Sequence, residues 1–444
     1  MYLPRSIDRE LRDWSAAPDR KPLVLRGARQ TGKTSAVRHL GSGFDLFLEL
    51  NLERYQDLAL VRACRSAEEL LTALAVRENL AALPPRTLLF LDEIQESAEA
   101  VAWLRFFRED HPELAVIAAG SLMEVRLREK GFSFPVGRVT FRALRPMTYV
   151  EFLQGSDANV LAERLTAAAR GDEELAPPLY DRALAALRDY LRIGGMPEAV
   201  ATWLSGGGEA RVRRIHADLV QALAEDLQKY RGVRDPSYLE AAFGSLRHHY
   251  GRRFKYENFA PGYRSQLMKT ALDKLEAAML VSRAWPTSSL ELPLVTKPRS
   301  APKLLPLDTA LALFTMGFDA SELRDAPIEQ LLDGRIAEMF VGQELIASRQ
   351  WEEPLHFWVS ESARGSAEVD FLVVRRGQPF PVEVKAGRSG TLKSLHRFLW
   401  RSGRSEAVRL FSGGITVKRH TVRMPDGDMT YTLKSIPLFM AGQL

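Results

Sequence analysis

Apolar residues in the first third of the chain follow two patterns that alternate along the sequence. Short apolar runs are typical of buried strands, whereas apolar residues every three or four positions are typical of helices that bury one side. Runs and one alternating stretch predict strands at 21–26, 44–52, within 87–95, at 114–119 and at 139–144. The spaced pattern predicts helices at 7–14, 35–40 and 66–78. This alternation predicts an α/β fold with a parallel sheet.

After residue 150 the pattern becomes mainly helical. Helices are predicted over 151–191 and 192–203, and a Gly-Gly-Met-Pro turn lies inside the second segment. The three glycines within 205–209 predict a hinge, and 211–230 reads as a long helix with its charges on one side. We expect most of this region to form a helical lid on the α/β core.

The segment 233–295 predicts a winged-helix-like unit, because three helices at 238–250, 256–260 and 264–278 precede a strand at 279–285. Basic residues on and before its third helix would neutralise phosphates of double-stranded DNA, although such units also serve purely as protein-contact modules. These residues are Arg252, Arg253, Lys255, Arg264, Lys269 and Lys274. Residues 288–306, rich in proline, serine and basic residues, are expected to be a linker.

The first candidate site is the loop between the first predicted strand and the helix after it. Residues 27–34 read Gly-Ala-Arg-Gln-Thr-Gly-Lys-Thr and match the phosphate-loop pattern G-x-x-x-x-G-K-[ST]. Glycines let successive backbone N–H groups turn toward phosphate oxygens, and the helix adds the positive end of its dipole. Lys33 would reach the β and γ phosphates, and the Thr34 hydroxyl would hold Mg²⁺. The predicted nucleotide-binding residues are Gly27, Ala28, Arg29, Gln30, Thr31, Gly32, Lys33, Thr34 and Ser35.

Residues 87–95 read Thr-Leu-Leu-Phe-Leu-Asp-Glu-Ile-Gln, an apolar strand that ends in two adjacent acids. This Walker B pattern delivers Asp92 to the carboxyl edge of a parallel sheet, where it would complete the magnesium shell through water. Glu93 would then act as general base on the attacking water. A strand that ends in solvated acids would carry the same letters, but the phosphate loop upstream favours the catalytic interpretation.

Two further polar residues are candidates for the hydrolysis site. Ser121 follows the strand at 114–119 and would sense the γ phosphate, although a serine at a strand end is also ordinary turn chemistry. Arg138 would stabilise charge on the transferring phosphoryl group, in its own subunit or in a neighbour; the alternative is a surface arginine after a turn.

A second candidate site lies near the carboxy terminus. Strands at 367–375 and 380–386 are joined at Arg376–Gly377, and a two-residue turn would set Asp370 opposite Glu383 with Lys385 on the same face. An Asp and a Glu-x-Lys on one sheet face form the skeleton of PD-(D/E)xK nucleases, whose carboxylates hold a divalent metal. Glu338 is predicted to face the core from a helix at 334–348 and to join them. A cross-strand salt bridge is the alternative.

Composition restricts these interpretations only mildly. The chain has 444 residues, enough for two to four domains, and its single cysteine, Cys64, excludes an internal disulfide. A net charge of +5 permits nucleic-acid contact without requiring it. No apolar run is long enough to cross a bilayer, and the first residues lack the layout of a secretion signal. We therefore expect a cytoplasmic protein without a membrane partner.

The motifs together resemble the prokaryotic AAA-type ATPases whose carboxy-terminal half is a domain of unknown function. Further residues that carry the resemblance are Gly120-Ser121, Gly137-Arg138, Arg145-Pro146-Met147-Thr148, Glu151-Phe152, Gly194-Gly195-Met196-Pro197, Asp226-Leu227, Pro302-Lys303 and Leu307-Asp308. The resemblance implies ATP as the nucleotide and a nuclease-like fold near the carboxy terminus. Leu122 departs from the pattern, because relatives usually carry a second serine there.

Two functional classes follow. In the first, a magnesium-dependent ATPase acts on DNA through the winged-helix unit and the nuclease-like domain. In the second, a nucleotide-controlled switch binds protein partners through its carboxy-terminal half. A phosphate-loop kinase is a weaker third, because Asp92-Glu93 suits activation of water. Oligomeric state stays open. The predicted parts are an AAA-type core at 1–155, a helical lid at 156–232, the winged-helix-like unit at 233–295 and a restriction-endonuclease-like α/β domain at 305–444.

Overall fold

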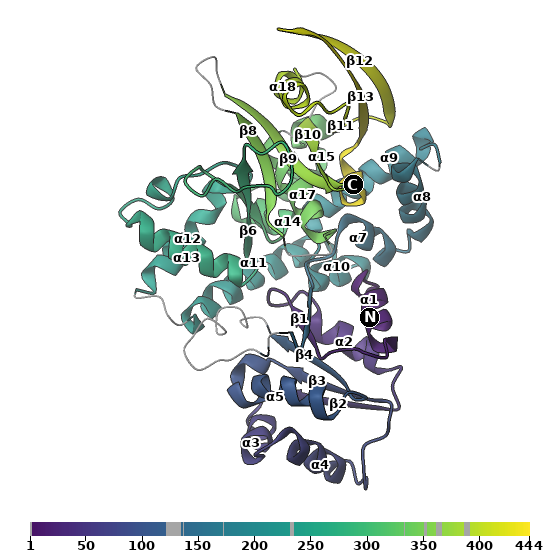
Figure 1. The fold of residues 1–444 in the computed structure, drawn as a ribbon, viewed down its shortest axis with the longest axis vertical. Helices are drawn as coiled ribbons and strands as arrows, with labels where there is room; N and C mark the ends of the chain where they lie inside the picture. The colour runs from purple at the N-terminus through teal and green to yellow at the C-terminus, as the bar shows by residue number, and fades with distance from the viewer. Residues whose placement is uncertain are drawn as a thin grey trace. The chain divides into compact units, whose positions relative to one another are not determined.

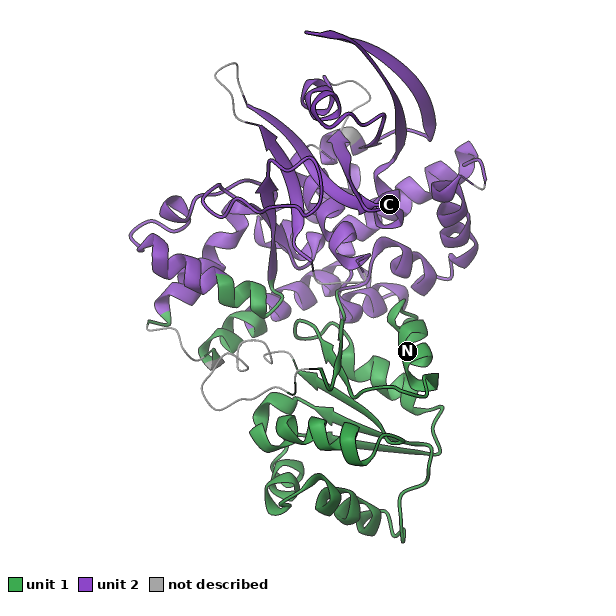
Figure 2. Ribbon diagram, in the orientation of Figure 1, with its two compact units in different colours: residues 1–145, 222–236, 273–280 green, residues 146–221, 237–272, 281–444 purple. Residues whose placement is uncertain are grey.

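The computed structural model describes residues 2–120, 135, 137–171, 173–230, 235–332, 334–349, 353–360, 366–385 and 391–444. The chain divides into two compact units (Figure 2). The first consists of Met1–Arg145, Ala222–Pro236 and Asp273–Leu280, and the second of Pro146–Gln221, Ser237–Leu272 and Val281–Leu444. The finer division into four parts stays a prediction. No helix in the described ranges is both long enough and apolar enough to span a membrane.

The first unit is organised around a parallel sheet. Its five described strands lie in the order β2-β3-β4-β1-β5, and Figure 1 labels the first four of these strands along the sheet. Every pairing is parallel, which confirms the α/β prediction. The strands are β1 Leu23–Arg26, β2 Leu46–Asn51, β3 Thr87–Asp92, β4 Ala115–Gly120 and β5 Thr140–Ala143. Because β4 lies between β1 and β3, the end of β3 reaches the loop after β1 across one intervening strand.

Helices cover both faces of this sheet. Leu89 and Leu91 of β3 belong to one apolar cluster with α5, whereas Leu88 and Phe90 belong to another with α1 and α2. Residues that alternate along a strand point to opposite faces, so both faces of β3 are buried. The helices of this unit are α1 Ile7–Ala16, α2 Lys33–Gly41, α3 Tyr55–Ala63, α4 Ala67–Arg77, η1 Ile94–Glu96 and α5 Ala98–Asp110.

The second unit contains a mixed sheet of eight described strands in the order β12-β13-β11-β10-β9-β8-β6-β7. Parallel pairs join β6 to β8, β10 to β11 and β11 to β13, and the other neighbours are antiparallel. The strands are β6 Val281–Thr287, β7 Lys303–Pro306, β8 Leu355–Ser360, β9 Ala367–Arg375, β10 Gln378–Lys385, β11 Glu406–Phe411, β12 Thr416–Met424 and β13 Gly427–Pro437.

Two segments of this sheet differ from the sequence expectations. The strand expected at the end of the winged-helix-like unit is β6, which pairs with β7 and β8 of the large sheet. The helices before it are α12 Ser237–His249, η3 Tyr256–Asn258 and α13 Ser265–Ala277. The end of the expected linker is β7, a buried strand. The strand was hard to recognise because β7 contains only two aliphatic residues, Leu304 and Leu305, between Lys303 and Pro306.

The remaining helices belong mainly to the second unit. They are α7 Tyr149–Gly155, α8 Asn159–Arg170, α9 Pro177–Ile193, α10 Pro197–Leu204, α11 Gly208–Asp226, η2 Leu227–Lys229, α14 Thr309–Thr315, α15 Ala320–Asp325, α16 Ile328–Leu331, α17 Gly334–Ala347, α18 Lys393–Ser402 and η4 Leu438–Gln443. The last five residues of α11, together with η2, fall in the first unit.

Buried hydrogen bonds explain two of the family-like motifs. The Asp308 carboxylate accepts hydrogen bonds from the backbone N–H groups of Gly195, at 2.7 Å, and Leu311, at 2.9 Å. Gly194 has a φ of +79°, and a Cβ there would collide with the Asp308 carboxylate. Asp308 therefore caps α14 and fixes the turn between α9 and α10 at the same time.

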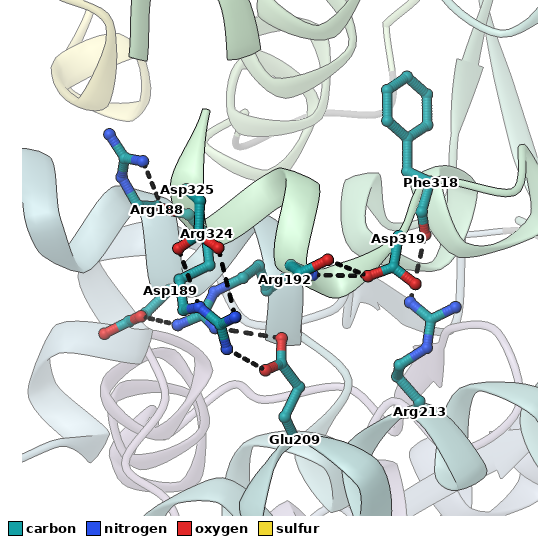
Figure 3. Close-up of polar contacts among 10 residues, drawn as sticks. Arg188, Asp189, Arg192, Glu209, Arg213, Phe318, Asp319, Arg324 and Asp325 are labelled. Carbon is teal, nitrogen blue, oxygen red and sulfur yellow. Dashed lines mark hydrogen bonds and ion pairs between the residues drawn. The ribbon is translucent and has the colours of Figure 1, made fainter. Parts of the chain in front are cut away.

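An ion-pair network fastens α15 to α9 and α11 (Figure 3). Arg192 bonds Asp189 and also Glu209, the latter at 3.1 Å, and Glu209 in turn accepts from Arg324 at 3.4 Å. Arg188 donates to the carbonyl oxygens of Arg324 and Ala326, each at 2.6 Å. These contacts join three helices of the second unit to one another.

Candidate functional site

The phosphate loop joins β1 to α2, as the sequence predicts. Gly32 is the N-cap of α2 with a φ of +95°, a conformation that glycine adopts without steric cost. A Cβ on Gly27 would lie 2.5 Å from the Leu144 carbonyl oxygen. Both glycines are thus required by the backbone itself, and the loop ends at the positive end of the α2 dipole.

Lys33 lies inside this loop. Its side-chain nitrogen donates to the carbonyl oxygens of Gly27 and Ala28, both at 2.9 Å, and the residue is 6% exposed. Burial lowers the pKa of Lys33, while the nearby charges of Glu93 and Asp92 act in the opposite direction. The loop therefore holds one cation whose present acceptors are backbone carbonyls, and phosphate oxygens are stronger acceptors for an ammonium group.

Thr34, in the first turn of α2, contacts Asp92 at the end of β3. The Thr34 hydroxyl donates to a carboxylate oxygen of Asp92 at 2.7 Å. Burial raises the pKa of Asp92, and the bond from Thr34 partly offsets this rise. A hydroxyl and a carboxylate in contact suit Mg²⁺, which keeps several waters and takes one or two protein oxygens besides phosphate. The two predicted magnesium ligands thus fit the ion.

Glu93 follows Asp92 in an unusual backbone conformation. Its φ of +51° is in the left-handed region, which a residue with a Cβ rarely adopts. The Gln95 side-chain amide donates to Glu93 Oε2 at 2.6 Å and so orients the carboxylate. Gln95 was not predicted from the sequence. The only indication was its position two residues after the predicted base.

Two arginines support the loop from outside the motif's fixed positions. Arg5, which is 8% exposed, donates to the carbonyl oxygens of Thr31 and Arg145, at 3.1 and 2.6 Å. Arg29, within the loop, pairs with Glu53 at 3.1 Å and Asp226 at 3.0 Å. Asp226 was noted above only as a residue that carries the family resemblance. Its contact with Arg29 places it beside the nucleotide loop.

The remaining predicted residues of this site are placed less directly. Ser121 lies outside the described residues. Arg138 follows Gly137 and forms an ion pair with Glu109 of α5 at 2.8 Å, with nearly half of its side chain exposed. Its role in hydrolysis stays a prediction.

The second predicted site also assembles. Arg376 and Gly377 form the two-residue turn between β9 and β10, because Arg375 pairs with Gln378, which confirms the predicted register. Continuing that register by one step sets Asp370 opposite Glu383. The Val384 N–H group donates to Asp370 Oδ2 at 2.8 Å.

A buried lysine that the sequence analysis did not assign to the site stands among these acids. Lys303 Nζ of β7 lies 2.7 Å from an oxygen of Glu338, 2.7 Å from one of Glu368 and 3.6 Å from one of Asp370. Burial lowers the pKa of Lys303, but the attraction of Glu338, Asp370 and Glu368 outweighs it and raises the pKa overall. The three acids therefore favour the charged form of Lys303.

Glu383 forms the other half of the cluster. Lys385 Nζ lies 2.7 Å from Glu383 Oε1, whereas Glu383 Oε2 is buried without a hydrogen-bond partner among the described residues. Burial is the main cause that raises the pKa values of Glu338 and Glu383, each to about 7. We refer to Lys303, Glu338, Glu368, Asp370, Glu383 and Lys385 as the carboxylate cluster.

The carboxylate cluster does not fit a divalent metal in this arrangement. Within the described ranges, no group of three or more His, Cys, Asp or Glu side chains has the geometry to hold a metal ion. Three of the acids, Glu338, Glu368 and Asp370, lie around the Lys303 ammonium, which occupies the position beside them that a metal would need.

Comparisons of the sequence with protein families match the region of the phosphate loop and the region of the carboxylate cluster to two different families. Residues 19–153 match an AAA domain, and residues 333–439 match a domain of unknown function (DUF4143). The chain belongs to the AAA-type ATPases with a carboxy-terminal domain of unknown function. Between these matches, residues 184–322 of this AAA-type ATPase match a further domain of unknown function (DUF8612). A comparison with curated proteins found no match.

Solved structures give a weaker comparison for the AAA-type ATPase. The ORC2 protein of Aeropyrum pernix in ADPNP–ADP complexes is 14% identical, with a TM-score of 0.26 over 76% of this chain and 95% of that one. Aeropyrum pernix ORC1 in complex with DNA is 16% identical, with a TM-score of 0.25 over 72% and 93%. Drosophila ORC bound to DNA is 14% identical, with a TM-score of 0.28 over 71% and 88%. Scores this low do not establish a common arrangement, so the family assignment rests on the sequence matches.

Proposed function

We propose that this AAA-type ATPase hydrolyses ATP in a magnesium-dependent reaction at the β1–α2 loop. The observation that carries the proposal is the 2.7 Å hydrogen bond between Thr34 and Asp92, beside the buried Lys33. It brings together the hydroxyl and ammonium groups of the first two residues of α2 and the carboxylate at the end of β3, although Thr34 and Asp92 are 58 residues apart. This is the set that a magnesium–triphosphate complex requires.

Binding begins with an exchange of acceptors at Lys33. Its ammonium leaves the Gly27 and Ala28 carbonyls and donates to phosphate oxygens, while backbone N–H groups of the loop and the N-terminus of α2 point toward the same anion. Bound Mg²⁺ neutralises phosphate charge. Thr34 and Asp92 would hold the ion, the carboxylate either directly or through water.

Glu93 performs the chemical step in this proposal. Its carboxylate accepts a proton from the attacking water, and Gln95 keeps one of its oxygens oriented through the 2.6 Å hydrogen bond. Arg138 would add a positive charge to the transferring phosphoryl group, and Ser121 would contact the γ phosphate or the water. Whether Arg138 acts in its own subunit or across a homo-oligomer follows from the assembly state.

Two substitutions test this site. Lys33→Ala should abolish ATP binding, since the loop then lacks the ammonium group that would reach the β and γ phosphates. Glu93→Gln should keep ATP binding within about threefold and lower kcat by at least about 100-fold, because a neutral amide cannot take the proton. Lys21→Ala and Glu96→Gln are matched controls that should leave kcat near that of the wild type. Equal hydrolysis by wild type and Glu93→Gln would refute the assignment of the base.

A second proposal concerns coupling to double-stranded DNA. The observation that favours it is the exposure of four cations of the winged-helix-like unit for which no acidic partner is described: Arg252, Lys255, Arg264 and Lys269. Arg253, in contrast, pairs with Glu368 at 3.3 Å. Exposed cations of this kind release counterions from a duplex, so binding should weaken steeply with salt.

DNA-stimulated hydrolysis separates this proposal from the protein-binding switch. Duplex DNA should raise the ATPase rate at low salt, and charge reversal at Arg264 and Lys269 should remove the stimulation without changing the basal rate. If DNA neither binds nor stimulates, the nucleotide-controlled switch with protein partners becomes the better description.

A further inference from the structure

Lys303 forms ion pairs with the acids of the predicted nuclease-like site, and the PD-(D/E)xK pattern does not account for a lysine at this position. Lys303 is 3% exposed, and its ammonium lies among carboxylates from α17 and β9. Three elements of the second unit, β7, α17 and β9, therefore meet at one cation. That cation is a side chain of the protein itself.

We propose that the Lys303 ammonium is the resident cation of the carboxylate cluster, standing in place of the divalent metal that a PD-(D/E)xK site would bind. The domain of residues 333–439 then folds and acts without a metal at these carboxylates, and it does not cleave DNA through them. This inference does not depend on the proposed ATPase chemistry.

Lys303 occupies the position beside the Glu338 and Glu368 carboxylates that a shared metal would take. Mg²⁺ needs ligand oxygens at about 2.0–2.1 Å in an octahedron. The nearest oxygens of Glu338 and Glu368 are both 2.7 Å from Lys303 Nζ, so a metal on either carboxylate would lie next to a like charge.

Lys303 is also fixed in its position. Its backbone pairs with Ala284 of β6 and forms an isolated bridge with Arg253. The ammonium lies 5.0 Å from the ring centre of Phe357 and 5.5 Å from that of Phe371, within the range of cation–π attraction. The side chain therefore cannot move into solvent without exposing or breaking several contacts at once.

The charges around the cluster are nearly balanced without a metal. Arg253 adds a second cation to Glu368 at 3.3 Å, and Lys385 pairs with Glu383 at 2.7 Å. The remaining carboxylates, Glu338 and Asp370, face Lys303. Three basic groups thus accompany four acids, so a divalent ion would change a small negative excess into a positive one.

The direct test is Mn²⁺ binding to the full chain without nucleotide, measured by electron paramagnetic resonance. Asp92→Asn is included so that any ion at the ATPase site is recognised. We expect no bound Mn²⁺ that depends on the carboxylate cluster, and no duplex cleavage with Mg²⁺ or Mn²⁺. One equivalent of Mn²⁺ that disappears in both Asp370→Asn and Glu383→Gln would overturn the proposal.

Substitution of the lysine provides the converse test. Lys303→Met should lower the melting temperature by about 10 °C, because it leaves buried carboxylates without their cation. Millimolar MnCl₂ should restore part of that loss, and the restoration should vanish in Lys303→Met/Asp370→Asn. Lys418→Met, at an exposed lysine of β12 outside the cluster, is the matched control, from which we expect no gain in Mn²⁺ response.

Each possible behaviour of the Lys303→Met variant still decides the proposal. A Lys303→Met variant as stable as the wild type, or one that is destabilised and ignores Mn²⁺, would contradict the role of Lys303. If the variant does not fold, the Mn²⁺ measurement on the wild type still decides. Neither readout involves ATP hydrolysis, so failure here is distinct from failure of the proposed ATPase.

Discussion

The Arg5 guanidinium donates a hydrogen bond to the Thr31 carbonyl oxygen at 3.1 Å, so a residue ahead of the first strand fixes the conformation of the phosphate loop. Thr31 itself is fully buried, and its hydroxyl donates to the Ala28 carbonyl oxygen at 3.0 Å. The loop is therefore held at both Ala28 and Thr31 before nucleotide binds. Preorganisation of this kind lowers the entropic cost of binding.

Arg5→Met should weaken ATP binding by about tenfold, because a hydrogen bond from a charged donor contributes roughly 1.5–3 kcal/mol. The melting temperature should fall as well, since Thr31 and Arg145 both lose a donor. Isothermal titration calorimetry and thermal unfolding measure the two effects. Arg9→Met, a substitution of an exposed neighbour, should change neither quantity; equal losses in both variants would show that the Arg5 contact is unimportant.

Gln95→Ala should reduce hydrolysis more than binding. The Gln95 amide contacts the Glu93 carboxylate at 2.6 Å, and removing it leaves the proposed base without that orienting donor. We expect kcat to fall by about tenfold and the Kd for ATP to change by less than about twofold, the signature of an interaction used in the chemical step. A Kd that rises in proportion to the fall in kcat would indicate a structural role for Gln95 instead.

Asp226→Asn should destabilise the chain more than Glu53→Gln, although both carboxylates pair with Arg29. The Asp226 side chain is 7% exposed, whereas that of Glu53 is 43% exposed. Solvent screens the exposed pair to about 0–1 kcal/mol, while loss of a mostly buried partner costs more. Melting temperatures of the two variants, measured at equal ionic strength, check the order, and the reverse order would contradict it.

Glu344→Gln should reduce the loss of stability that accompanies a rise in pH from 4.5 to about 8. Burial is the main cause that raises the pKa of Glu344 from 4.5 to about 8, and its carboxyl group accepts the Tyr149 N–H at 3.0 Å. Between these two pH values the folded chain binds more protons than the unfolded chain, so the free energy of unfolding falls as pH rises. The amide cannot ionise and removes this contribution, which is of the order of a few kcal/mol.

Melting temperatures from pH 5 to pH 9 test the sign. Relative to the wild type, Glu344→Gln should gain stability as pH rises through the window. The slope should shrink without vanishing, because Glu338 and Glu383, with pKa values raised to about 7, remain in the variant. A difference between the two proteins that does not depend on pH would contradict the raised pKa of Glu344.

The sequence by itself determined the features whose parts are close along the chain. The phosphate loop, the acids that end β3 and the β9–β10 hairpin each depend on a few consecutive residues. A two-residue turn alone sets the register that brings Asp370 opposite Glu383, and strand alternation adds Lys385. Glu338 was correctly expected to face inward, because helical spacing places it beside apolar residues.

Only the tertiary structure decided which distant side chains neutralise one another. Lys303 lies in a four-residue strand that was expected to be linker, and it is 35 residues from Glu338 and 67 from Asp370. Strand order determines such pairs, and strand order depends on which apolar faces the folded chain can bury together. For the same reason Arg5 and Asp226, which are 26 and 197 residues from their loop partners, left no local signal.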